Sequence, residues 1–116
     1  MDDINKIIKK LGQRPILVGQ SGEASTYGWG EKLNKHTANG EVFNPMDLTA
    51  ASYQYPANSM VKVIDKKTGK SVVVRINDLG PNKRLNRPID LSQGAWRALG
   101  YNRPGLTEVD IEPINE

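Results

Sequence analysis

The chain has 116 residues, 37% of them hydrophobic and 25% charged, which fits one compact domain with a modest core and argues against a second domain. It contains no cysteine and one histidine, so disulfides, thiolate metal sites and multi-histidine metal sites are excluded, and we expect no metal and no cofactor. The formal net charge of +3 favours an acidic polymer as partner, whether nucleic acid, anionic lipid or cell-wall glycan. Nucleic acid ranks lowest, because the basic residues form no stripe and no base-reading motif occurs.

No window reaches the roughly 20 apolar residues that cross a bilayer, so no membrane span is predicted. The start Met1-Asp2-Asp3-Ile4 has neither the basic residues nor the apolar run of a secretory signal. We therefore expect that the chain as given is not exported by that route. A trimmed piece, a cytoplasmic product and a virion component released by lysis all stay open.

Residues 2–12 predict a short amphipathic helix, because Ile4, Ile7, Ile8 and Leu11 recur at helical spacing before Gly12. Its apolar stripe either packs on the domain or docks on a partner protein. We therefore divide the chain into an N-terminal helix with a linker, 1–21, and a barrel domain, 22–114.

Short apolar runs separated by Gly, Pro and Asn follow the helix and predict strands. The runs are 16–18, 24–27, 48–51, 60–64, 71–76 and 106–111. The polar loop 65–70, with Gly69 near its end, is typical of a hairpin. One internal helix is expected over 93–99, capped by residues 90–92 and followed by Gly100. Many short strands and one brief internal helix indicate a mainly β protein, a small β-barrel.

Two acidic residues stand out by their position next to turns. Asp78 ends the apolar strand that begins at Ser71 and is followed directly by Leu79-Gly80-Pro81, so a rigid strand presents a carboxylate beside a turn. Glu41 follows Asn39-Gly40, a pair that forces a tight turn and fixes the direction of the next side chain. Each acid taken alone is also compatible with a plain turn.

Five sequence blocks carry a resemblance to a known family. They are Gly22 to Gly28, Thr37 to Glu41, Leu48 to Ala51, Ser71 to Pro81, and Ile89 to Ser92 with Ala95 and Leu99-Gly100. In this order and spacing, over about residues 22–112, they resemble the rare lipoprotein A family. The resemblance implies a six-stranded double-psi β-barrel, similar to those of expansins and barwin-like proteins, and a lytic transglycosylase acting on peptidoglycan glycan strands. It also implies a periplasmic or cell-envelope location.

The residues that matter most in the family fall on Glu41, Ser52 and Asp78. The two acids are retained, whereas Ser52 stands where the family carries a histidine. Lytic cleavage needs an acid for the leaving oxygen and a base for the sugar's own 6-hydroxyl, and one carboxyl group can serve as both. We expect Asp78 in that role, Glu41 as the carboxylate that tunes it, and Ser52 as a residual hydrogen-bond donor that cannot relay a proton near neutral pH.

Substrate-binding residues are expected around the polar blocks. Tyr27 and Trp29 can stack on a sugar face, and we expect Trp29 to be exposed between its two glycines. Short hydrogen-bonding groups come from Thr37, Asn39 and Asn77. His36 could replace the missing histidine, but we expect a surface loop residue.

Two other readings of the sequence stay open. Because of Ser52, the barrel could be a catalytically weakened glycan-binding or structural module, for instance in a phage tail or a cell-envelope assembly. A water-using inverting hydrolase would instead need carboxyl groups about 6.5–9.5 Å apart.

Overall fold

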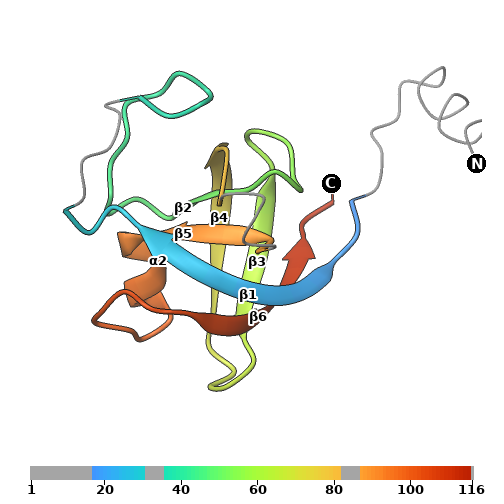
Figure 1. Cartoon of the computed structure of the whole chain (residues 1–116). Coiled ribbons are helices and arrows are strands. Elements are labelled where there is room, and N and C mark those ends of the chain that lie inside the picture. Colours follow the sequence, from blue (N-terminus) through green and yellow to red (C-terminus); the bar gives the residue numbers. More distant parts are fainter. Residues whose placement is uncertain (1–16, 31–35, 82–86, 116) are drawn as a thin grey trace, which may run out of the picture.

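The computed structural model of the chain describes residues 17–30, 36–81 and 87–115, and these form a closed barrel of six strands (Figure 1). The strands are β1 (Gln20–Tyr27), β2 (Thr49–Ala51), β3 (Met60–Asp65), β4 (Ser71–Asp78), β5 (Ile89–Ser92) and β6 (Thr107–Pro113). The predicted mainly β, six-stranded barrel is confirmed. The predicted helix over 2–12, and any docking of a partner protein on it, lie outside the described residues.

The strands close in the order β1-β5-β2-β4-β3-β6. Two neighbouring pairs, β1 with β5 and β2 with β4, run parallel, and the other four pairs are antiparallel. The predicted hairpin is confirmed: β3 and β4 pair from Met60↔Arg75 to Ile64↔Ser71, and the turn between them is closed by Asp65 N–H donating to Lys70 O at 2.8 Å. Full closure removes the free strand edges of an open sheet.

The side chains of alternate residues along β3 and β4 fill the interior of the barrel. Val61 and Val63 of β3 and Val72, Val74 and Ile76 of β4 are buried. The residues between them are exposed or partly buried, as period-2 side-chain alternation requires. β-Branched residues suit this pleated, half-buried surface, and they place the functional groups of β4 on its outer face or at its end.

One predicted strand is wrong and one strand was missed. Within the predicted run 16–18, Leu17 and Val18 are described and belong to no strand, and Val18 is 76% exposed. The sixth strand is β5, which lies between β1 and β2 with three of its four residues buried. Its sequence Ile89-Asp90-Leu91-Ser92 does alternate apolar and polar residues, but it is only four residues long, and Asp90-Leu91-Ser92 also fits the cap of the helix that follows.

The internal helix α2 (Gln93–Ala98) confirms the prediction to within one residue. Its N-cap is Ser92, whose Oγ accepts a hydrogen bond from Ala95 N at 3.2 Å, and Gly100 follows with a φ of +100°. The helix buries Trp96 against the barrel. In the part of the chain that the structure covers, no helix is long and apolar enough to cross a membrane.

Candidate active site

Asp78 ends β4 with one carboxylate oxygen fixed by the backbone. Its Oδ1 accepts hydrogen bonds from Ala38 N at 3.0 Å and from Leu79 N at 2.9 Å. Its Oδ2 accepts no hydrogen bond from the described residues. The fold therefore orients this carboxylate with one oxygen and leaves the other for a ligand.

Glu41 is held by three side chains. Arg75 donates from Nη1 to Oε2 at 3.0 Å and from Nη2 to Oε1 at 2.7 Å, and Asn77 Nδ2 donates to Oε1 at 2.7 Å. Asn39 Nδ2 adds a contact of 3.2 Å to Oε2. These donors, Arg75 first and Asn77 second, lower the pKa of Glu41 from 4.5 to about 2. Glu41 is therefore an ionised acceptor near neutral pH, unsuited to donate a proton.

The turn before Glu41 is pinned to the end of β4. Within it, Thr37 N–H donates to Glu41 O at 2.9 Å, and Gly40 N–H donates to Thr37 O at 2.9 Å. Gly40 has a φ of +90°, which favours glycine at this position. Across to β4, Ala38 N–H reaches the Asp78 carboxylate, as described above. One short turn thus brings Glu41 and Asp78 to the same strand end.

A pocket of about 460 Å³ opens beside Asp78, and we call it the Asp78 pocket. It is lined by Tyr27, His36, Thr37, Ala38, Phe43, Asp78 and Leu79. Tyr27 is buried and stacks on Phe43 with ring centroids 5.3 Å apart. Burial raises the pKa of Tyr27, and the negative charges of Asp78, Asp90 and Glu41 raise it further. Of the two predicted acids, Asp78 is among the described residues that line this pocket and Glu41 is not.

Ser52 is fully buried and its side chain is used by the fold. Its hydroxyl donates to Pro88 O at 2.9 Å and accepts from Gln54 N at 3.0 Å. Its backbone N–H donates to Asp78 O at 3.1 Å. The backbone of Ser52 thus adjoins Asp78, while its hydroxyl and the Asp78 carboxylate share no hydrogen-bond partner among the described residues.

The predicted substrate-binding residues fall into different surroundings. Trp29 is partly buried instead of exposed: its Nε1 donates to Thr26 Oγ1 at 2.8 Å, and the Arg97 guanidinium lies 4.7 Å from the ring centroid. A hydrogen-bonded indole covered by a cation packs against the core, which explains why exposure between two glycines was wrong. His36 is exposed, as expected, and lines the Asp78 pocket.

Thr37 and Asn77 are buried, and Asn39 bonds Glu41 and the backbone of its own turn. Asn77 gives its amide N–H to Glu41, while no hydrogen bond reaches its buried Oδ1 from the residues that the structure describes. Among the predicted residues, Tyr27 and Thr37 line the Asp78 pocket. Asn39 and Asn77 support Glu41 beside it.

Arg75 is the functional residue that sequence reasoning missed. It lies on β4 between the buried Val74 and Ile76, two positions before Asn77, so both polar side chains leave the strand on the same side. An arginine inside an otherwise apolar strand, in step with an asparagine and followed by an aspartate, was the available signal.

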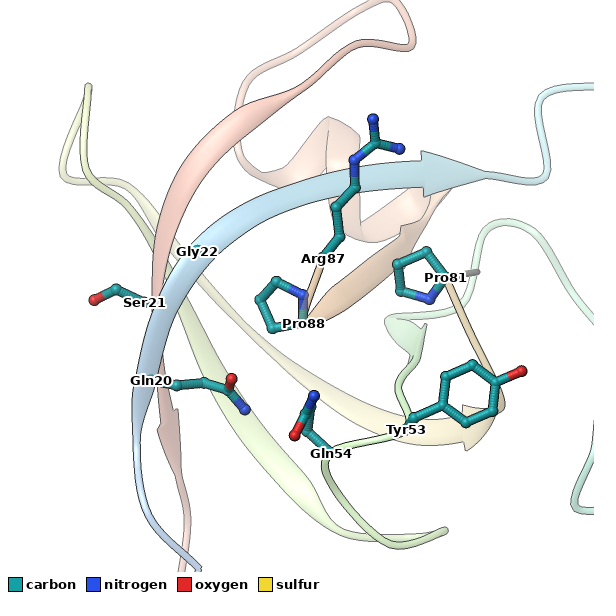
Figure 2. Close-up of a pocket in the computed structure, with 8 residues that line it drawn as sticks. All are labelled: Gln20, Ser21, Gly22, Tyr53, Gln54, Pro81, Arg87 and Pro88. Carbon is teal, nitrogen blue, oxygen red and sulfur yellow. The ribbon is translucent and has the colours of Figure 1, made fainter. Parts of the chain in front are cut away.

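A second pocket of about 590 Å³ lies beside Pro88, and Figure 2 shows the side chains that surround it. We call it the Pro88 pocket. Its lining residues are Gln20, Ser21, Gly22, Tyr53, Gln54, Pro81, Arg87 and Pro88. Of these residues, Tyr53 directly follows Ser52 in the sequence, and Pro81 lies three positions after Asp78.

The fold and the site together define a small closed β-barrel protein that presents an oriented carboxylate in an open pocket. Sequence comparison gives its family. The chain belongs to the lytic transglycolase family, whose model matches residues 19–111.

Similar proteins carry names from this family. The chain is 49% identical over 111 residues to a probable endolytic peptidoglycan transglycosylase RlpA from Nostoc sp., covering 92% of this chain and 30% of that protein. It is 45% identical over 103 residues to the endolytic peptidoglycan transglycosylase RlpA of Rickettsia bellii, covering 87% and 45%. The chain thus spans less than half the length of these relatives. The fold is similar to that of a Clavibacter michiganensis expansin, with a TM-score of 0.65 at 20% identity, covering 85% of this chain and 52% of the expansin.

Proposed function

We propose that this chain is a lytic transglycosylase domain that cleaves β-1,4 glycosidic bonds in peptidoglycan glycan strands and leaves 1,6-anhydro ends. The observation that carries the proposal is the Asp78 carboxylate, anchored through Oδ1 by two amides and open at Oδ2 beside a pocket. The names of the relatives supply the substrate class and the reaction.

Asp78 acts twice in the proposed reaction. In its protonated form it gives its proton to the glycosidic oxygen as the bond from C1 to that oxygen breaks. The resulting carboxylate then takes the proton of the sugar's 6-hydroxyl, whose oxygen bonds to C1 and closes the anhydro ring. The proton count of Asp78 is restored, and no water is consumed.

Glu41 organises the site in this proposal. Its two oxygens are occupied by Arg75, Asn77 and Asn39, so it holds the turn whose Ala38 N–H fixes Asp78.

The experiment incubates the parent protein with glycan strands stripped of stem peptides and analyses the products by mass spectrometry. We expect anhydro ends from the parent, and a rate lower by a factor on the order of 10²–10⁴ from Asp78→Asn. Glu108→Gln, an exposed carboxylate that lines neither pocket, is the control and should match the parent. Products heavier by one water would indicate a hydrolase, and no product from a folded parent would overturn the proposal.

A second candidate is a weakened glycan-binding or structural module, favoured by the buried Ser52 at the family's histidine position. Such a module would be retained on intact sacculi without releasing products. If Ser52→His gained activity, loss of the histidine proton relay would explain why the module releases no products.

A peptidoglycan substrate places the proposed action in the cell envelope, and a virion-associated or excised domain stays an alternative within this proposal. The N-terminal segment as a dock for a partner protein likewise stays a proposal. So does the division of the chain at residue 21.

A further inference from the structure

We propose that the Pro88 pocket is a second saccharide subsite, which takes the glycan strand beyond the sugars at Asp78. The inference rests on the proposed function for its substrate class. It goes further in assigning a separate set of residues to the extension of the strand, with the buried hydroxyl of Ser52 holding that subsite in place.

Ser52 joins the two pockets. Its backbone N–H is bonded to Asp78 O at 3.1 Å, which ties the segment after β2 to the end of β4. Its hydroxyl then bonds Pro88 O and Gln54 N, and both of those residues line the Pro88 pocket. The described residues that line the two pockets are different sets, and this connection fixes the position of one set relative to the other.

The lining has the chemistry that a sugar needs. Figure 2 shows the side-chain amides of Gln20 and Gln54 turned toward one another, and the ring of Tyr53 beside Pro81 at the opposite end. Amides give paired donors and acceptors for hydroxyl and acetamido groups, while aromatic and proline rings offer apolar faces to sugar C–H groups. The volume of about 590 Å³ lies within the range of about 300–1,000 Å³ of small-molecule sites.

Close packing builds the pocket. A Cβ added to Gly22 would lie 2.8 Å from both Cδ and Cγ of Pro88, so the glycine lets Pro88 rest on β1. Arg87 Nε donates to Glu23 at 2.9 Å, which fixes the residue before Pro88. The segment after Ser52 is also anchored, because the hydroxyl of buried Tyr55 donates to Val18 O at 3.0 Å.

A saccharide fits this position better than an extended peptide. Peptides commonly bind by adding a strand to an open sheet edge, and here the strands of the described chain close into a barrel. Tyr53, which lines the pocket, is 46% exposed.

The test measures binding separately from cleavage. The protein carrying Asp78→Asn is titrated with reduced, peptide-free N-acetylglucosamine–N-acetylmuramic acid oligosaccharides of increasing length, followed by ¹H–¹⁵N NMR. We expect affinity to rise with length and the amides of Gln20 and Gln54 to shift only with the longer oligosaccharides. Added to this background, Tyr53→Ala should weaken binding of the longest oligosaccharide about tenfold, which corresponds to about 1.4 kcal/mol, and leave the shortest unaffected.

Leu106→Ala, another exposed apolar residue that lines neither pocket, is the matched control and should bind like the background protein. Equal long-chain affinity in Tyr53→Ala, Gln54→Ala and Leu106→Ala would overturn the subsite, even if the parent releases anhydro products. Length-dependent shifts at Gln20 and Gln54 would support it, even if no product forms and the proposed reaction fails.

Discussion

Arg75 and Glu41, 34 positions apart in the sequence, form an ion pair through two hydrogen bonds of 3.0 and 2.7 Å. The pair joins β4 to the turn that follows Asn39-Gly40, and Asn77 strengthens it from the same strand. It uses both oxygens of Glu41, which leaves Asp78 as the carboxylate with an open oxygen. The position of Arg75 therefore determines why Glu41 has a structural role and Asp78 is left open to a ligand.

We expect Arg75→Met to lower the free energy of unfolding by about 1–2 kcal/mol, because a bidentate, two-thirds-buried pair with neighbouring amides is worth more than an exposed one. Lys66→Met is the matched control, since Lys66 pairs with Asp110 at 3.6 Å between side chains 43% and 48% exposed. It should cost less than about 0.5 kcal/mol. Urea unfolding measures both, and equal losses would contradict the role given to Arg75.

The contribution of Glu41 to the free energy of unfolding should depend on pH. Its pKa is lowered from 4.5 to about 2 in the folded chain, so its contribution is complete above the unfolded value and is lost as the pH falls from about 4.5 to about 2. We expect the difference in unfolding free energy between the parent and Glu41→Gln to be constant from pH 7 to 5 and to shrink below pH 4.5. A difference that stays the same down to pH 2.5 would show that Arg75 and Asn77 do not hold the ionised form.

Local sequence patterns were enough for most of the barrel. Apolar runs rich in β-branched residues marked β3 and β4, and Ser92 with Gly100 marked the ends of α2. They failed at β5, because this strand has only four residues and its last residue, Ser92, is also the N-cap of α2. They also predicted a strand at 16–18, although a short apolar run is a weak signal for a strand when no partner strand pairs with it.

The site was predictable only in part for a similar reason. Motif blocks pointed to Glu41 and Asp78, and the turn that holds them was recognisable from Asn39-Gly40. The bidentate contact of Arg75 and the burial of Ser52 depend on which strands become neighbours. Such long-range pairings leave no local pattern in a single sequence.

Gly94 should be the most sensitive glycine of the helix and its surroundings. A Cβ at this position would lie 2.2 Å from Met46 O, a backbone atom that cannot turn aside. We expect Gly94→Ala to destabilise the fold by about 3 kcal/mol, at the upper end of overpacking. At Gly105 the nearest atom to an added Cβ is 3.9 Å away, so Gly105→Ala should stay within about 0.5 kcal/mol of the parent. Thermal unfolding followed by circular dichroism ranks the two, and the reverse order would refute the packing of α2 against Met46.

Ser52→Ala tests whether a buried hydroxyl holds the segment between the two pockets. The change removes the buried hydrogen bond from the Ser52 hydroxyl to Pro88 O and takes away the acceptor of Gln54 N. We expect a loss of about 1–3 kcal/mol, the cost of unsatisfied buried groups. The control Ser71→Ala removes an exposed hydroxyl at the start of β4 and should change the unfolding free energy by less than about 0.5 kcal/mol. Hydrogen exchange gives the local readout: the amide of Gln54 should exchange faster in Ser52→Ala than in the parent. Unchanged protection there would mean that the hydroxyl of Ser52 does not hold this segment.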